Sequence, residues 1–399
     1  FDFTVNAISE IIATFWKNRI TLVKFGRLFS KNFLRNIARL EYTKTLEDVA
    51  KTVSKPLLVL GAGEGLDTLS YSSFSPNDFF IITVDAALSP LLARNITPDA
   101  VVTMESQIAI EKTFLGAKNK NILLFADLCA RPEATKILGG NIIWFATKYA
   151  DGIFFDNLKK ESVIRNFIEP MGSVGLAATY IALKIRSSSS IPVFIAGLDF
   201  SYSIGTTHAK DTMALKQRFI NSNRLTPIEN YDAAFSMSTQ TVMSKNGKKI
   251  CSTKILLQYA QQFKLMFQNE KNLFDCSSTG IKLGIPQRNL FATKGNLQKE
   301  KCESHKNISS FCEKEKRKLE ELRSLLSDGE KSPFRNNLPE KLSLSKQIKK
   351  IAEEREYLFL HFPDGYRFKM EQSFLKRIRA ETDFFIKQLE IAMKENKPL

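Results

Sequence analysis

Glycines and acidic residues follow almost every short apolar run between residues 55 and 286, and their types and spacing suggest ligand chemistry. The clearest segment is Gly61-Ala-Gly-Glu-Gly-Leu-Asp67, which directly follows the apolar run Leu57–Leu60. Glycines allow a tight turn and a close approach of the backbone to a ligand. The N–H groups of a helix that begins there favour an anion. The candidate ligands of a phosphate-bearing molecule are therefore Gly61, Gly63, Gly65 and Asp67.

A second glycine-containing segment, Met171-Gly-Ser-Val-Gly175, has the pattern of a helix start. Serine is a residue type that caps a helix N-terminus by accepting a hydrogen bond from a backbone N–H group. The remaining N–H groups would also favour an anion. We therefore consider two roles for Gly172 and Ser173: a helix cap alone, or a cap that also takes part in anion binding.

The loop after the apolar run Val193–Ala196 contains both Asp199 and His208, and the chain has only three histidines. A histidine in such a loop is a candidate general base, because its usual pKa lies close to neutral pH. The alternative is a histidine that only packs at the surface. Further along, the segment Asp275–Gly284 carries Thr279, whose hydroxyl would either contact a phosphate or sugar or belong to a plain turn.

Two carboxylates complete the set of candidate site residues. Asp85 and Glu105 follow the apolar runs Phe79–Val84 and Ala100–Thr103, and they would either share a divalent cation or bind ribose or sugar hydroxyls. The sequence has no G-x-x-x-x-G-K-[ST] loop, no H-E-x-x-H motif and no acidic residue at the spacing that reads the ribose of NAD. We therefore expect no P-loop nucleotide site, no NAD site and no dedicated metal centre.

The elements that must position these residues are indicated by short apolar runs that alternate with helical stretches. This alternation predicts an α/β fold, a Rossmann-like and mostly parallel sheet flanked by helices. In such sheets ligands bind beyond the carboxyl ends of the strands, where the strand order reverses, so the candidate residues should meet there. The expected strands are Leu57–Leu60, Phe79–Val84, Ala100–Thr103, Ile122–Phe125, Ile142–Phe145, Val193–Ala196 and Asn272–Asp275.

Helical segments are predicted on both sides of this α/β region. Apolar residues recur at helical spacing before residue 53, and stretches rich in Lys and Glu with spaced leucines follow residue 290. We therefore divide the chain into an N-terminal helical arm (1–53), a Rossmann-like domain (54–290) and a C-terminal helical region (291–399).

The composition is that of a globular protein with a basic surplus. The 399 residues are 43% hydrophobic and 25% charged, and the formal net charge is +16. Because Lys and Glu interleave along most of the chain, we favour a scattered basic surface over a nucleic-acid-binding or membrane-binding face. The five cysteines form no CxxC pair, which predicts a reducing, cytoplasmic setting. We expect no membrane span and no signal peptide, and the oligomeric state is open.

Taken in order, these segments make the chain resemble the Maf (motility-associated factor) flagellin glycosyltransferases over roughly residues 20 to 290. The central domain of that family is related to archaeal 6-hydroxymethyldihydropterin pyrophosphokinase and to bacterial CMP-sialic acid sialyltransferases. The matching segments are Gly61–Asp67, Val84–Thr103, Gly172–Val174, Gly197–Tyr202 with Thr207–Ala209, and Asp275–Gly284.

The chain departs from the family pattern at two places. Glu64 and Gly65 replace the usual Pro-Ser of the first loop, and Glu105 stands where the family often has aspartate. A carboxylate at Glu64 would weaken phosphate binding by the loop unless its side chain points outward.

The resemblance implies transfer of a nonulosonic, sialic-acid-like sugar from its CMP donor to Ser or Thr hydroxyls of flagellin, with no further cofactor. We expect Gly61–Asp67 and Gly172–Gly175 to hold the CMP moiety and His208, with Asp199, to act in catalysis. One alternative is a pyrophosphokinase that moves diphosphate from ATP to a pterin-like alcohol, with Mg²⁺ on Asp85, Glu105 or Asp127. The other is a flagellar binding protein without catalytic activity.

Overall fold

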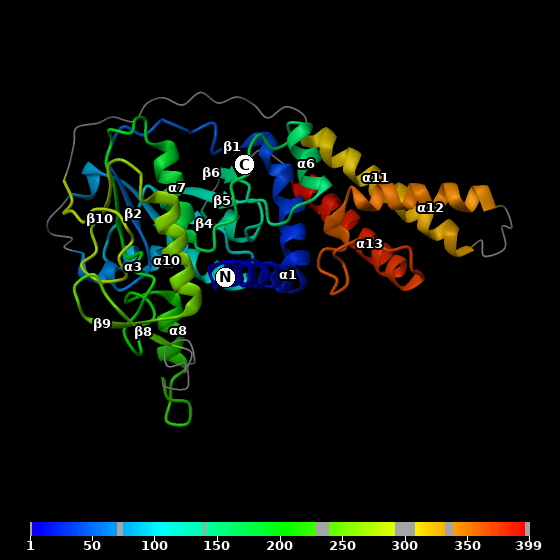
Figure 1. The fold of residues 1–399 in the computed structure, drawn as a ribbon. Helices are drawn as coiled ribbons and strands as arrows, with labels where there is room; N and C mark the ends of the chain where they lie inside the picture. Colours follow the sequence, from blue (N-terminus) through cyan, green and yellow to red (C-terminus); the bar gives the residue numbers. More distant parts are fainter. Residues whose placement is uncertain are drawn as a thin grey trace.

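A parallel eight-stranded sheet forms the core of the α/β region, in the left half of Figure 1. The computed structural model describes residues 2–69, 75–138, 141–228, 239–291, 308–331 and 338–395. The strand order is β1-β6-β5-β4-β3-β2-β7-β10, and every neighbouring pair is parallel. The strands are β1 (Lys44–Thr45), β2 (Leu57–Leu60), β3 (Phe80–Val84), β4 (Ala100–Thr103), β5 (Leu123–Asp127), β6 (Ile142–Phe145), β7 (Val193–Ala196) and β10 (Leu273–Asp275). The predicted α/β fold with a mostly parallel sheet is confirmed.

The strands form where the sequence has short, continuous apolar runs. In β2, β3, β4, β6 and β7 every residue is buried, as expected for parallel strands that are covered by helices on both faces. β2, β4, β6 and β7 span the expected residues, and β3 and β10 begin one residue later than expected. The fourth expected strand, Ile122–Phe125, corresponds to β5, which begins one residue later and ends two residues later, so that Asp127 is still part of the strand.

Two features of the sheet region differ from the sequence-based expectation. β1 lies inside the segment predicted as a helical arm, and it extends the sheet by pairing with β6. An antiparallel hairpin, β8 (Gln240–Met243) and β9 (Lys249–Ser252), follows the His208 region. Both features escaped detection because β1 has only two residues and β8 is largely exposed. The Asn246-Gly247 pair, typical of hairpin turns, was the available signal for the hairpin.

The strand order reverses at β2. The chain builds β2 to β6 outward in one direction and then crosses back to place β7 on the other side of β2. Leu57 is accordingly paired with Phe80 of β3 on one side and with Val193 of β7 on the other. The crevice between the loops after β2 and β7 is therefore the topological switch point, where open parallel sheets bind ligands.

Helices cover both faces of the sheet (Figure 1). α7 (Val174–Ile185) and α10 (Lys254–Phe267) bury apolar residues against one face, including Ile181 and Phe263. The carboxyl-terminal half of α1 (Asp2–Ile37) and α6 (Ile153–Lys160) pack with β5 and β6 in a second buried cluster. Apart from the three long carboxyl-terminal helices, the other helices of the described residues are η1 (Ala38–Tyr42), α2 (Gly65–Thr68), η3 (Pro76–Asp78), α3 (Asp85–Ala93), η4 (Ile108–Ile110), α4 (Glu111–Phe114), η5 (Leu115–Ala117), α5 (Ala134–Ile137), α8 (Met213–Asn221) and η7 (Glu356–Leu358).

The carboxyl-terminal helices project from the side of the sheet domain, with α1 between them and the sheet (Figure 1). They are α11 (Ile308–Lys331), α12 (Leu338–Glu353) and α13 (Gln372–Glu395), and α13 packs against both α11 and α1. Their apolar residues, such as Leu322 and Phe385, belong to the same buried cluster as Trp144 of β6. The helical region and one face of the sheet therefore share a core. Within the described ranges, no helix has the length and apolar character that crossing a bilayer requires.

Candidate functional site

The loops after β2 and β7 touch at the switch point. The Gly61 N–H group donates to the Ala196 carbonyl at 2.8 Å, and the Gly63 N–H group donates to the Gly197 carbonyl at 2.8 Å. A Cβ atom on Gly61 would lie 2.3 Å from the Gly197 oxygen, a distance that forces the backbone to move. Glycine is thus required at Gly61 by the contact between two loops, independently of any ligand.

The N–H groups of Gly61, Gly63, Gly65, Leu66 and Asp67 have acceptors within the protein. Gly65 donates to Oδ2 of Asp199 at 2.6 Å, and the N–H groups of Leu66 and Asp67 donate to the carbonyls of Gly63 and Glu64. The helix that follows, α2, is only four residues long, so its dipole is small. Phosphate binding by Gly61, Gly63 and Gly65 stays a prediction, and in this structure the position of an anion beside Gly65 is taken by the Asp199 carboxylate.

Asp199 is the central buried acid of the switch point. It is 2% exposed, and burial raises its pKa to about 6, although hydrogen bonding from Gly65 and the charge of Lys245 oppose this rise. Oδ1 is buried and has no hydrogen-bond partner among the described residues. A Cβ atom on Gly63, Gly65 or Gly280 would come within 3 Å of the Asp199 side chain, so glycines make the space that this carboxylate occupies.

A buried ion pair that the sequence analysis did not predict lies beside Asp199. Nζ of Lys245, in the β8–β9 turn, pairs with Oδ2 of Asp275, and their side chains are 2% and 3% exposed. The Lys245 N–H group also donates to the Gly280 carbonyl at 2.9 Å, and Ser277 N–H donates to Oδ1 of Asp275 at 2.9 Å. The hairpin thereby fixes the loop after β10 against Asp199.

Thr279 lies in that loop, next to Gly280, whose φ of 91° is in the left-handed region. Its Oγ1 is buried and has no hydrogen-bond partner within the part of the chain that the structure describes. The N–H group of Ile281, two residues on, donates to the Asp199 carbonyl at 3.0 Å. The structure thus brings Thr279 to the same loop contact as Asp199, and its contact with a ligand stays a prediction.

The His208 segment packs on the glycine loop. Ala209 N–H donates to the Ala62 carbonyl at 2.8 Å, and Lys210 N–H donates to Oδ2 of Asp67 at 2.9 Å. Nδ1 of His208 shares a hydrogen bond with Oγ1 of Thr207 at 2.9 Å. Burial, and then the charge of Arg218, lower the pKa of His208, so its imidazole is neutral at pH 7.

The Glu64 side chain is directed toward the loop after β7. Its carboxylate accepts hydrogen bonds from the N–H group of Ser203 (3.0 Å), the hydroxyl of Ser203 (2.8 Å) and the hydroxyl of Thr206 (2.6 Å). The negative charge that the sequence places inside the glycine loop is therefore matched by three donors of residues 203–206.

The second expected helix start is formed as predicted, and residues of α10 lie against it. Ser173 is the N-cap of α7, and its Oγ accepts from the Gly175 N–H group at 3.2 Å. Gly172 N–H donates to Oε1 of Gln262 in α10 at 3.4 Å, and a Cβ atom on Gly172 would lie 2.0 Å from the Tyr259 ring. The capping role is confirmed, while anion binding at this helix start stays a prediction.

Asp85, Glu105 and Asp127 follow along the same edge of the sheet. Asp85 is buried and accepts from the Thr103 hydroxyl at 2.8 Å and the Ala86 N–H group at 2.7 Å. Burial raises its pKa to about 6 against these two hydrogen bonds. Both oxygens of Asp127 are likewise bonded, to Cys129 N–H and to the N–H and hydroxyl of Thr147. Asp85 and Asp127 therefore both accept hydrogen bonds that join neighbouring segments of the protein, and a bound cation is not needed to explain their positions.

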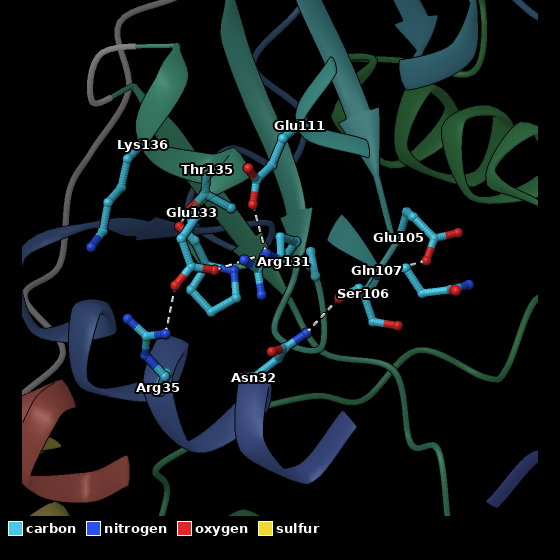
Figure 2. A network of polar contacts seen from close by, with 12 residues as sticks. Asn32, Arg35, Glu105, Ser106, Gln107, Glu111, Arg131, Glu133, Thr135 and Lys136 are labelled. Atoms are coloured by element: carbon cyan, nitrogen blue, oxygen red, sulfur yellow. Dashed lines mark hydrogen bonds and ion pairs between the residues drawn. The ribbon is translucent and has the colours of Figure 1, made fainter. Parts of the chain in front are cut away.

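Two asparagines of α1 hold the loops after β4 and β5. The amide nitrogen of Asn32 donates to the carbonyls of Ser106 (3.1 Å) and Cys129 (3.0 Å), and that of Asn36 donates to the carbonyls of Leu128 (2.9 Å) and Ala130 (2.8 Å). Figure 2 shows Asn32 reaching the loop that carries Ser106 and Glu105. The helical arm therefore positions the loop after β4, which carries Glu105, and its sequence does not reveal this role.

Arg131 connects the same loops by charge. Its Nε pairs with Glu111 at 2.8 Å and with Glu133 at 2.9 Å, and Glu133 in turn pairs with Arg35 of α1 at 2.6 Å (Figure 2). Arg35 also pairs with Glu395 of α13 at 3.0 Å. The carboxyl-terminal helices are in this way linked to the edge of the sheet that carries the candidate residues.

Nine of the eleven predicted site residues thus lie in the segments that follow β2, β3, β4, β7 and β10, and the other two, Gly172 and Ser173, lie at the start of α7. No group of three or more His, Cys, Asp or Glu side chains with metal-binding geometry occurs among the residues described. The four described cysteines are free thiols, and three of them, Cys129, Cys251 and Cys312, are buried.

One protein family and two individual proteins match this chain in sequence. Residues 31–205 match the family described as 6-hydroxymethylpterin diphosphokinase MptE-like. An uncharacterized protein of Treponema pallidum (strain Nichols) is 31% identical over 416 residues, which cover 98% of this chain and 71% of that protein. A second uncharacterized protein of the same organism is 26% identical over 228 residues, covering 57% of this chain and 46% of its own length.

Among solved structures, that of a MAf glycosyltransferase from Magnetospirillum magneticum AMB-1 matches with a TM-score of 0.49 and 14% sequence identity. The match covers 93% of this chain and 61% of that chain. This chain therefore spans less than two thirds of that structure and less than half of the second Treponema protein.

Proposed function

We propose that this chain, whose residues 31–205 match the MptE-like family, is a Maf-type glycosyltransferase. In this proposal it moves a nonulosonic sugar from a CMP donor to a Ser or Thr hydroxyl of flagellin. One observation carries the proposal: the glycine loop, Asp199 and His208, which are far apart in sequence, meet at the switch point of the sheet. Ligands of parallel α/β sheets bind at that position.

The proposed reaction exchanges one bond at the anomeric carbon of the sugar. The bond from this carbon to the phosphate oxygen breaks and its electron pair leaves with CMP, while the acceptor hydroxyl oxygen bonds to the carbon and loses its proton. His208 is suited to take that proton because its lowered pKa keeps the imidazole neutral at pH 7. When Nδ1 carries the ring proton and donates to Thr207, Nε2 presents the lone pair that a base needs.

Asp199 has a supporting part in the proposal. Its Oδ2 fixes Gly65, and its unpartnered Oδ1 is an acceptor for a hydroxyl or amino group of the donor. The glycine loop and the α7 start, which both contact Leu198, would lie on either side of the CMP moiety.

The test is a transfer assay with CMP-activated nonulosonic acid and flagellin, using His208→Ala. Loss of a general base lowers turnover by about 100-fold or more, so we expect at least that loss for the variant. His361→Gln serves as the matched control, because His361 pairs with Glu381 in the helical region. Unchanged transfer by His208→Ala would remove His208 from the mechanism.

A second candidate function is supported by the family match itself. Its description names a 6-hydroxymethylpterin diphosphokinase, and such an enzyme transfers diphosphate from ATP with Mg²⁺. Thermal-shift measurements with CMP, CDP, ATP and GTP, each with and without Mg²⁺, separate the candidates. Stabilisation by CMP without metal supports the glycosyltransferase, and stabilisation by ATP only with Mg²⁺ supports the kinase. No response to any nucleotide supports a binding protein without catalytic activity.

A further inference from the structure

The half-buried Glu64 carboxylate accepts three hydrogen bonds from one turn of the loop after β7. Both of its carboxylate oxygens are used: Oε1 accepts from Ser203 N–H and the Thr206 hydroxyl, and Oε2 accepts from the Ser203 hydroxyl. Ser203 is exposed and Thr206 is half-buried. The donors are therefore within reach of a dissolved ligand, whereas the Gly65 N–H group is not.

The turn that supplies these donors has a backbone hydrogen bond of its own, which does not involve Glu64. The Thr206 N–H group donates to the Ser203 carbonyl at 3.0 Å, and the two residues form an antiparallel bridge. One backbone N–H and two hydroxyls that converge on one anion form the donor pattern by which proteins bind phosphate oxygens as well as carboxylates. In this structure the carboxylate of Glu64 is the anion.

A positive charge next to the turn favours an external anion there. Nη1 of Arg218 donates to the Thr207 hydroxyl at 2.7 Å, and the nearness of this guanidinium is one of the causes that lower the pKa of His208. Arg218 has no carboxylate partner among the residues that the structure describes. This half-buried guanidinium matches the geometry and charge of a phosphate group.

We propose that the turn at 203–206, with Arg218 beside it, is a phosphate subsite, and that Glu64 occupies this subsite until the phosphate of a ligand displaces its carboxylate. This inference deepens the proposed function, on which it depends only for the identity of the ligand as a CMP donor. It assigns the phosphate to the loop after β7 and gives Glu64 the role of a competing internal anion. Rebinding of Glu64 would then help to release the CMP product.

The experiment measures dissociation constants for CMP, cytidine and inorganic phosphate by calorimetry, with wild type and three variants. Glu64→Ala should bind CMP and phosphate about tenfold more tightly, because a competitor worth about 1.4 kcal/mol is removed. Arg218→Gln and the double variant Ser203→Ala/Thr206→Val should bind both about tenfold more weakly. Cytidine has no phosphate, so its affinity should be unchanged in every variant. Glu161→Ala, which removes a carboxylate paired with Lys314 elsewhere, is the matched control.

The outcomes separate the inference from the proposed function. Equal changes for CMP and cytidine in Glu64→Ala would overturn the inference, because Glu64 would then only hold the loop. Unchanged phosphate affinity in both Glu64→Ala and Arg218→Gln would overturn it as well. If wild type binds neither CMP nor cytidine, the proposed CMP donor is wrong. In that case the phosphate measurements decide the inference. Tighter phosphate binding by Glu64→Ala than by wild type supports it, and equal or weaker phosphate binding overturns it.

Discussion

Replacing Asp199 by asparagine tests the electrostatics of the switch point directly. The asparagine side chain has the same shape and can still accept the hydrogen bond from Gly65, but it has no ionised form. In the wild type, burial raises the pKa of Asp199 from 3.8 to about 6, because a 2% exposed carboxylate has lost its hydration. Asp275 and Glu64 add to this rise through their negative charges.

The sign of the effect follows from proton binding. Because the pKa of Asp199 is higher in the folded protein than in the unfolded chain, the folded protein binds the proton more tightly. The stability that this contributes is fully present below pH 3.8 and is lost as the pH rises through 6. The difference between about 6 and 3.8, at 1.36 kcal/mol per pKa unit, corresponds to about 3 kcal/mol of unfolding free energy.

The assay is urea unfolding of wild type and Asp199→Asn at a series of pH values from 4 to 8. Relative to wild type, the variant should gain about 2 kcal/mol between pH 4 and pH 6. The difference should level off above about pH 7, since the rest of the roughly 3 kcal/mol is lost below pH 4 and between pH 6 and 7. Asp85, whose pKa is raised in the same direction, is present in both proteins and cancels. Asp151→Asn, at a side chain that is 98% exposed, is the control. A pH-independent difference, or one that falls with rising pH, would refute the reasoning.

Two further predictions concern contacts of the loops after β2 and β5. Gly61→Ala places a methyl group 2.3 Å from the Gly197 oxygen, and this substitution should lower the unfolding free energy by roughly 1–3 kcal/mol. Gly116→Ala is the control, because its added Cβ would have its nearest neighbour at 3.8 Å. Equal thermal stabilities of the two variants would contradict the prediction. Asn36→Ala leaves the buried carbonyls of Leu128 and Ala130 without their donor and should cost about 1–3 kcal/mol in urea unfolding. Asn141→Ala removes only an exposed hydrogen bond, and an Asn36→Ala loss no larger than that of this control would show that the loops after β5 do not depend on α1.

The strands and their order along the chain were readable from the sequence. Parallel strands buried on both faces must be apolar throughout, so Leu57–Leu60 and Val193–Ala196 stand out from their polar surroundings, and both became strands within those bounds. The Ser173 cap was readable for a similar reason, because capping is decided by residues that are neighbours in sequence. The two-residue strand β1 was not, since it exists only by pairing with β6.

What the sequence alone determined is therefore the local part of this protein: the apolar runs, the helix starts, and the loops in which glycines and acids cluster. Only the tertiary structure decided which groups those loops present to one another. Asp199 reaches Gly65 across 134 residues, Glu64 reaches Ser203 across 139, and Lys245 reaches Asp275 across 30. Propensity and spacing act over a few residues, whereas these pairs depend on how the sheet reverses its order at β2. Because of that reversal, the protein's own carboxylates occupy the surroundings of a glycine loop that was expected to bind an anion through its N–H groups. Asp199 accepts the hydrogen bond of the Gly65 N–H group, and Glu64 binds the loop after β7.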